Sequence, residues 1–270
     1  MKKVLINFAD GKFKRSQRLN SRTGRLIGGF DKVIEYSPAD IDASFYNQHR
    51  EILDEKRGAG LWLWKPYFIH KTLTTLNDGD ILMYCDSGAM FCRNVNSQIE
   101  SMKNDIWVSD IPLIEEQWTK PALFEYFNVT ENDRLSPQVQ ASFIILRKSN
   151  ATVSFIEKWL DLCCVSNLIF PVGLHEERGE CIEHREDQSI LSVLCKKMGI
   201  LPHPDPTQFR RKPEIYKGEN RKWISTNHSD STEKICIVHY RNTEIGKIQL
   251  LKLWILAMIP TRIWCTFFQR

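Results

Sequence analysis

Apolar and polar residues follow one another along the chain in blocks that predict strands and helices in turn. Short apolar runs bounded by turn residues predict strands at residues 4–8, 32–36, 81–85, 105–109, 140–146 and 235–239. Apolar residues with helical spacing predict helices at residues 44–56, 66–76, 152–164 and 186–198. Because strands and helices alternate, we expect an α/β domain with a mixed, mostly parallel sheet flanked by helices.

The strand predicted at residues 81–85 is apolar throughout, which is typical of a strand buried on both faces. It ends in Asp86, Ser87 and Gly88. Ligands of open α/β sheets bind beyond the carboxyl ends of strands, where an Asp can bind a ribose hydroxyl or a Mg²⁺ or Mn²⁺ ion that bridges phosphates. The alternative is that Asp86 only caps the following turn.

The segment Arg57-Gly-Ala-Gly-Leu-Trp-Leu-Trp-Lys-Pro lies directly before a predicted helix whose first residue is Pro66. Helix N-termini attract anions, and a Lys or Arg placed there can neutralise a pyrophosphate. The spacing is not that of a P-loop. The alternative is a tight turn with Trp62 and Trp64 in the core and Lys65 in solvent.

The segment His184-Arg-Glu-Asp-Gln-Ser begins the helix predicted at residues 186–198. Asp187 falls in the first turn of that helix, where the helix dipole favours a carboxylate. The functional alternative is that Asp187 and Gln188 contact a sugar hydroxyl, or that Asp187 acts as a base. His239 ends the last predicted strand, and a lone His at such a place is more often structural.

The distribution of net charge along the chain argues against one class of function, nucleic-acid binding. The 37 Lys and Arg against 33 Asp and Glu give +4, and the last 25 residues carry Lys247, Lys252, Arg262, Arg270 and no acid. The remaining chain therefore sums to zero, which argues against a broadly basic surface for nucleic acid. We expect no nucleic-acid partner.

The cysteines and the N-terminal residues predict the compartment. The early apolar stretch at residues 4–9 is shorter than the roughly 7–15 residues of a signal-peptide core. We therefore expect a cytoplasmic protein whose eight Cys are reduced. No pair of cysteines has zinc-site spacing.

The C-terminal segment 246–270 predicts an amphipathic helix appended to a domain at residues 1–245. The basic residues fall on one side, and the other side holds Leu250, Leu253, Trp254, Leu256, Ala257, Trp264, Phe267 and Phe268. This pattern predicts a helix that lies on a membrane surface and kinks at Pro260. The alternative is a helix docked on the domain.

Taken together and in this order, three motifs resemble a known family. They are Arg57-Gly-x-Gly-x-Trp-x-Trp-Lys-Pro-Tyr, then Gly79-Asp80 followed by Tyr84-x-Asp86-x-Gly88, and then His184-Arg-x-Asp187-Gln188-Ser189. The pattern is similar to bacterial and viral glycosyltransferase-like proteins of the GT-A fold, which are distantly similar to glycosyltransferase family 8. The resemblance covers roughly residues 4–241.

The resemblance implies a nucleotide-sugar site and a role for each matching residue. Asn7, Ala9 and Asp10 would face the base, and Lys65 and Arg57 would approach the diphosphate. Asp187 and Asp86 would be the catalytic residues. The other donor contacts would come from Trp64, Asp86, Ser87, Gly88 and Gln188.

The resemblance also implies a divalent metal, Mn²⁺ or Mg²⁺, held by Asp86 and His239. The family's metal motif has a second carboxylate, whereas this chain has Gly88 there. The implied function is a hexosyltransferase that moves a sugar from a nucleotide sugar to a glycan or lipid-linked acceptor in surface polysaccharide synthesis. Together with the C-terminal segment, this function predicts a protein that lies peripherally on the inner face of the cell membrane. The alternatives are a non-catalytic nucleotide-sugar-binding module and a nucleotide-dependent enzyme of another class.

Overall fold

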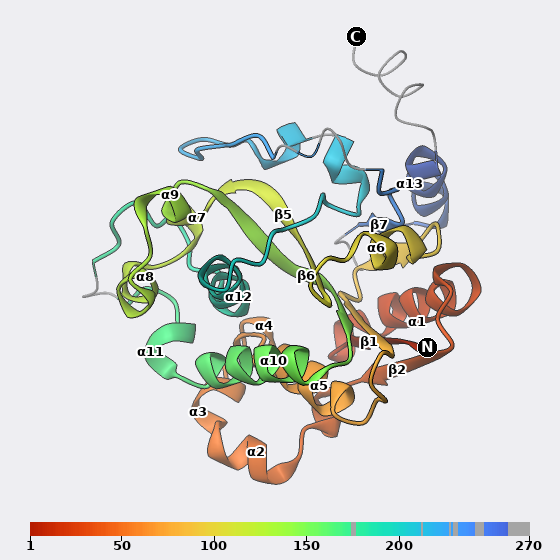
Figure 1. The fold of residues 1–270 in the computed structure, drawn as a ribbon, viewed down its shortest axis with the longest axis horizontal. Helices are drawn as coiled ribbons and strands as arrows, with labels where there is room; N and C mark the ends of the chain where they lie inside the picture. The colour runs from red at the N-terminus through yellow and green to blue at the C-terminus, as the bar shows by residue number, and fades with distance from the viewer. Residues whose placement is uncertain (174–176, 212, 227, 229–231, 241–245, 259–270) are drawn as a thin grey trace.

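A five-stranded sheet forms the centre of the molecule in the computed structural model (Figure 1). The structure describes residues 1–173, 177–211, 213–226, 228, 232–240 and 246–258. The strand order is β2 (Lys32–Tyr36), β1 (Lys3–Phe8), β3 (Ile81–Cys85), β6 (Pro137–Arg147) and β5 (Ile106–Ile114). β1 pairs in parallel with β2 and β3, whereas β6 is antiparallel to both β3 and β5. The expected mixed sheet, in which four of the five strands share one direction, is confirmed.

Each face of the sheet packs on its own apolar core. In β1, Val4 and Ile6 face a core shared with α5 (Trp64–Leu73), α10 (Asn150–Cys163) and α12 (Glu186–Lys197). Leu5 faces the opposite core, which includes β4 (Ala89–Phe91). This alternation follows the two-residue period of a strand. Side chains of β3 divide between the same two cores, which explains why that strand is apolar at every position.

Shorter elements connect these layers. They are α1 (Lys14–Thr23), α2 (Ala43–Gln48), α3 (Arg50–Leu53), α4 (Gly58–Leu61), α6 (Asn96–Ser101), α7 (Glu115–Trp118), α8 (Pro121–Phe127), α9 (Glu131–Arg134), α11 (Ser166–Ile169), β7 (Ile237–His239) and α13 (Lys247–Met258). A π-helical turn, η2 (Gly24–Gly28), follows α1. The 3-10 turns are η1 (Gly11–Phe13), η3 (Pro38–Asp40), η4 (Gln208–Arg211) and η5 (Pro213–Tyr216). All seven cysteines of the described residues are free, and none of the described helices has the length and apolarity needed to cross a membrane.

Several sequence predictions need correction at their boundaries. The helix predicted at residues 44–56 is interrupted at His49, whose φ of −117° and ψ of 28° are not helical. α5 begins two residues before Pro66, which is tolerated because the first N–H groups of a helix have no intrahelical partner. β7 does not join the main sheet but pairs with β4.

The sequence predicted that the apolar face of the C-terminal helix is free to contact a membrane, and for α13 this prediction is wrong. Leu250, Leu253 and Trp254 of α13 pack against the domain, and Ala257 is fully buried there. Arg93 donates to the carbonyls of Ala257 at 3.1 Å and Met258 at 2.7 Å, which fixes the end of the helix. The docked alternative therefore holds for residues 247–258. The part of the prediction that concerns Pro260, Arg262, Trp264, Phe267, Phe268 and Arg270 lies outside the described residues.

Candidate functional site

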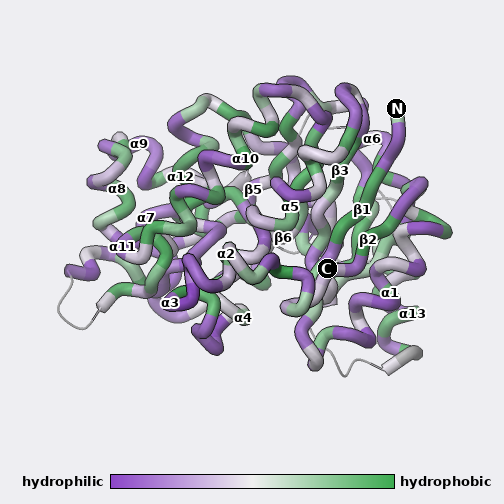
Figure 2. The backbone as a smooth tube through the Cα atoms, turned by 90° about the horizontal axis from the view of Figure 1, so that it is seen from below, coloured by the Kyte–Doolittle hydropathy of each residue, from purple (hydrophilic) through white to green (hydrophobic). Residues whose placement is uncertain are grey.

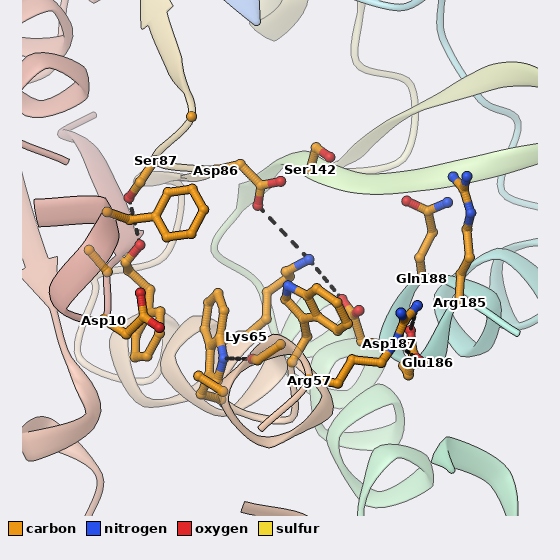
Figure 3. A pocket seen from close by; sticks show the side chains of 18 of the residues that line it. Asp10, Arg57, Lys65, Asp86, Ser87, Ser142, Arg185, Glu186, Asp187 and Gln188 are labelled. Carbon is orange, nitrogen blue, oxygen red and sulfur yellow. Dashed lines mark hydrogen bonds and ion pairs between the residues drawn. The ribbon is translucent and has the colours of Figure 1, made fainter. Parts of the chain in front are cut away.

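A cavity of about 580 Å³ opens at the carboxyl ends of β1 and β3 (Figure 3). Its walls come from the turn after β1, the segment before and within α5, the turn after β3, the start of α12 and the end of β7. Eleven of the twelve predicted site residues line it, namely Ala9, Asp10, Arg57, Trp64, Lys65, Asp86, Ser87, Gly88, Asp187, Gln188 and His239. The structure therefore brings together segments that lie far apart in the sequence.

Lys65 is the central cation of this cavity. Its Nζ lies 2.8 Å from Oδ2 of Asp187 and 4.0 Å from Oδ1 of Asp86, and its side chain is only 5% exposed. Burial by itself lowers the pKa of Lys65, but the two carboxylates outweigh that effect and the net pKa is raised. The alternative in which Lys65 lies in solvent is therefore wrong.

Asp86 presents its carboxylate to the cavity from the turn that follows β3. Its Oδ1 accepts a hydrogen bond from the hydroxyl of Tyr84 at 2.6 Å, and its side chain remains 31% exposed. The neighbouring Ser87 donates to the carbonyl of Phe8 at 2.5 Å and so ties this turn to the end of β1. Both strands thus deliver polar groups to one edge of the sheet.

Asp187 and Glu186 lie side by side in the first turn of α12. Burial raises the pKa of Asp187 to about 6, although Lys65 opposes the shift. Burial also raises the pKa of Glu186 to about 7, against the opposing effect of Arg57. Glu186 has a φ of 42°, a left-handed conformation that side-chain-bearing residues rarely adopt. Strain of this kind persists where surrounding contacts hold it, and it clusters at functional sites.

Arg57 bridges two walls of the cavity. Its Nε donates to Oε1 of Glu186 at 2.6 Å and its Nη2 donates to Oε1 of Glu183 at 2.5 Å. The guanidinium predicted to approach a diphosphate is therefore already paired with carboxylates, and its side chain is 45% exposed. Lys65 is the more deeply buried of the two predicted phosphate-binding cations.

The turn between Arg57 and α5 is left-handed over five residues. Gly58, Ala59, Gly60, Leu61 and Trp62 all have φ between 50° and 100°. Such conformations cost roughly 1–2 kcal/mol for each residue that carries a Cβ. Sequence reasoning expected only a helix break here. The signal was the pair of glycines, Gly58 and Gly60, but the pair does not predict that Ala59, Leu61 and Trp62 adopt the same left-handed conformation.

Trp64 closes the floor of the cavity. Its indole Nε1 donates to the carbonyl of Gly58 at 2.8 Å, and its ring stacks on Phe8 with ring centroids 3.8 Å apart. The aromatic pair thus joins the left-handed turn to the end of β1. This contact positions Lys65, the next residue, beneath Asp86.

The structure places Asn7 behind the cavity rather than in its wall, so the prediction that Asn7 contacts a base needs correction. The side chain of Asn7 is buried and donates to Asn20 at 2.8 Å and Ser21 at 3.0 Å. Asp10, three residues on, does line the cavity, and its buried Oδ1 has no hydrogen-bond partner among the described residues. Asp10 is thus the residue at this strand end with capacity for a ligand.

Gln188 lines the cavity but is held by β6. Its Nε2 donates to Oε1 of Gln138 at 2.7 Å, and its Oε1 accepts from the backbone N–H of Ala141 at 3.2 Å. The amide is therefore fixed in orientation before any ligand binds. Further residues of the wall were not predicted, namely Phe8, Lys12, Phe13, Lys56, Gly58, Ala59, Trp62, Tyr84, Ser142, Glu183, Arg185 and Glu186.

The donor set does not fit the metal that the resemblance implies. Asp86 and His239 both line the cavity, but no group of three His, Cys, Asp or Glu side chains among the described residues is arranged to hold a metal ion. Gly88 supplies no second carboxylate, and Oδ1 of Asp86 accepts from Tyr84 and faces the ammonium of Lys65. The one carboxylate at this end of the cavity is thus already engaged by a hydroxyl donor and by a cation.

Comparison with known proteins places the fold. No protein-family model matches the sequence, and a search of curated proteins finds no match. The galactosyltransferase LgtC, crystallised with donor and acceptor sugar analogues, is 12% identical, with 97% of this chain and 99% of LgtC covered and a TM-score of 0.50. The likeness shows that the chain has a glycosyltransferase fold of the GT-A type.

Two further solved structures match at lower TM-scores. The apo form of mouse xyloside xylosyltransferase 1 is 10% identical, with 91% of this chain and 99% of that chain covered and a TM-score of 0.48. The apo form of the glycosyltransferase GlyE from Streptococcus pneumoniae TIGR4 is 13% identical over 98% of this chain, with a TM-score of 0.46. The chain spans 64% of the length of GlyE.

Proposed function

We propose that the protein is a glycosyltransferase of the hexosyltransferase type that moves a sugar from a nucleotide-sugar donor to a glycan or lipid-linked saccharide. The observation that carries the proposal is the buried ammonium of Lys65 between Asp86 and Asp187, in a cavity at the carboxyl ends of two parallel strands. A positive charge in a secluded site stabilises negative charge as it develops on a leaving diphosphate.

In the proposed reaction, each residue of the cavity has its own role. The donor's bond between the anomeric carbon and the diphosphate oxygen breaks, and that oxygen's developing charge falls next to Lys65. The oxygen of the acceptor hydroxyl forms the new bond to the anomeric carbon, its proton is released to water, and the nucleoside diphosphate leaves with the electron pair of the broken bond. Asp187 contacts the reacting sugars, Asp86 orients Lys65 and the diphosphate, and Asp10 accepts a hydrogen bond from the nucleoside.

The cellular role follows as part of the same proposal. The protein would act in the synthesis of surface polysaccharide, such as O-antigen, capsule or lipooligosaccharide, from the cytoplasm and peripherally on the inner face of the cell membrane. Beyond α13 the sequence holds further basic and aromatic residues, Arg262, Trp264, Phe267 and Phe268, which suit a membrane surface. A lipid-linked acceptor would be presented there.

A thermal-shift screen over nucleotide sugars tests the proposal, because a ligand that binds only the native state raises its melting temperature. We expect one nucleotide sugar to raise it, and the purified protein to transfer that sugar to an acceptor. Asp86→Asn should abolish transfer, and activity within a few-fold of the parent would contradict the role of Asp86. Thermal shifts that show no preference for sugar-linked diphosphates would instead favour a nucleotide-dependent enzyme of another class.

A second candidate is a nucleotide-sugar-binding module without catalysis. Gly88, in place of a carboxylate, is the observation that favours it. Such a module would bind the nucleotide sugar yet give neither transfer nor hydrolysis over a panel of acceptors. Release of free sugar from the donor would exclude it.

A further inference from the structure

The helix α1 carries a face made of arginines. Arg15, Arg18 and Arg22 lie on α1, and Arg25 lies on η2, which follows. Their spacing of three, four and three residues puts them on one side of a helix, and all four are exposed. Residues 11–30 hold six Lys and Arg and no acid. The body of the protein is neutral in sum, but this part of it is strongly basic.

Within the part of the chain that the structure describes, these arginines have no carboxylate partner. Among the described residues, none of the four forms an ion pair with a carboxylate, whereas Arg50, Arg57 and Arg147 each do. Unpaired like charges on one helix face repel each other and favour the unfolded chain slightly. An external anion would relieve that repulsion.

The helix α13, which neighbours α1, carries an exposed apolar stripe. Leu19 of α1 packs in the same apolar cluster as α13, and Figures 1 and 2 place the two helices at one corner of the molecule. On the outer side of α13, Ile248, Leu251 and Ile255 are 75%, 56% and 49% exposed. Their helical spacing makes them one stripe. These residues differ from those that the sequence predicted for a membrane, of which Leu250, Leu253, Trp254 and Ala257 pack against the domain.

We propose that the arginine face of α1 and the outer stripe of α13 form one surface that docks on an anionic phospholipid membrane. Arginines meet lipid phosphates, and the apolar stripe enters the boundary between headgroups and acyl chains. A soluble polyanion would engage the arginines but would leave the stripe in water. The apolar stripe next to the basic face therefore favours a membrane over an acidic polymer.

The proposed membrane-docking surface lies next to the cavity in the chain. Lys12 and Phe13 lie directly before α1 and line the cavity wall. A saccharide attached to a lipid in the docked membrane would thus emerge near the cavity opening. Membrane docking itself does not depend on the transferase activity proposed above and is measured without any donor.

Co-sedimentation of the full chain with vesicles tests the proposal, using phosphatidylcholine alone and mixed with phosphatidylglycerol. We expect binding to the anionic vesicles that weakens as salt is raised. Each arginine near such a surface strengthens binding about fivefold, so Arg18→Gln with Arg22→Gln should weaken it roughly twentyfold or more. Leu251→Gln with Ile255→Gln should weaken binding while leaving the salt dependence in place.

The matched control removes two charges elsewhere. Lys158 on α10 and Lys197 at the end of α12 are exposed, and Lys158→Gln with Lys197→Gln should leave vesicle binding within twofold. Equal losses in the arginine and lysine variants would overturn the proposal. Retention of dextran sulfate without vesicle binding would overturn it in favour of an acidic polymer. Melting temperatures within a few degrees of the parent confirm that each variant is folded.

Discussion

The ammonium of Lys65 lies 2.8 Å from the carboxylate of Asp187, and both side chains are at most 5% exposed. The two residues lie on different helices, α5 and α12, whose N-termini meet at the cavity. Taking two charges out of water is costly, and their attraction repays the cost only while both are present. The pair therefore ties the stability of the domain to the chemistry of its site.

Replacing Lys65 by Met should destabilise the protein strongly. Asp187 would remain buried without its cation, and loss of one partner of a buried pair costs about 3–5 kcal/mol. Urea unfolding at pH 7.5 measures this loss. Lys71→Met is the matched control on the same helix: Lys71 pairs with the exposed Asp42, so its loss should cost less than about 1 kcal/mol.

The double variant Lys65→Met with Asp187→Leu separates the ion pair from simple packing. Replacing both charges by apolar groups of similar size is often neutral, so most of the lost stability should return. Losses that add in the double variant would contradict the pairing. In that case Lys65 and Asp187 would stabilise the fold independently.

Asp187 should also make stability depend on pH in a defined direction. Burial raises its pKa from 3.8 to about 6 in the folded state, so the folded protein holds a proton that the unfolded chain releases between these values. This stabilisation is complete below about pH 4 and is lost as the pH rises through about 6. Asp187→Asn does not titrate and provides the reference.

The free energy of unfolding of the parent, minus that of Asp187→Asn, should therefore fall as the pH rises from 4 to 7. The expected fall is about 3 kcal/mol, at roughly 1.4 kcal/mol per pKa unit. Urea unfolding of both proteins at half-unit steps of pH measures it. Parallel curves, or a difference that grows with pH, would show that Asp187 has an ordinary or lowered pKa when folded.

The left-handed turn before α5 should respond differently to two substitutions one residue apart. Gly60 has a φ of 100°, and a Cβ there would lie 2.9 Å from Cα of Leu53. Gly60→Ala should therefore cost about 2 kcal/mol or more from strain and contact together. It should also weaken ligand binding, because Arg57 and Trp64 flank the turn.

Ala59→Gly is the control for that substitution. Ala59 has a φ of 52°, so glycine relieves strain there, while the freer unfolded chain offsets about 0.4–1 kcal/mol of the gain. The net change in the free energy of unfolding should stay within about 1 kcal/mol of zero. Similar losses for both substitutions would mean that the turn is not held left-handed in solution.

Much of the cavity could be predicted from the sequence, because many of its residues follow patterns that a short stretch of sequence reveals. Buried strands end in recognisable turns, so Asp86, Ser87 and Gly88 fall where a parallel sheet opens. The hydrogen bond between Arg57 and Glu186 joins residues that are 129 positions apart, and no local sequence pattern predicts such a contact. The sequence also predicted a free apolar face on α13, because periodicity identifies an apolar side but not what covers it.

The net charge of the chain likewise does not predict where charges lie on the folded surface. The charges of the residues before 246 sum to zero, which argued against a broadly basic surface. The sum hid the arginines of α1, whose compensating acids lie elsewhere in the chain. Where charges gather on a surface depends on the fold, and a total for the chain does not contain that information.

Nucleotide binding should not require a divalent metal. Lys65 already supplies a buried cation beside Asp86, and Gly88 leaves that side of the cavity with one carboxylate. The nucleoside diphosphate that gives the largest thermal shift among UDP, GDP, CDP and ADP should raise the melting temperature equally in EDTA and in Mn²⁺. Lys65→Met should lose this shift in EDTA, whereas Lys71→Met should keep it. A shift that appears only with Mn²⁺ would mean that Asp86 and His239 bind a metal together with the diphosphate, and that Lys65 does not replace it.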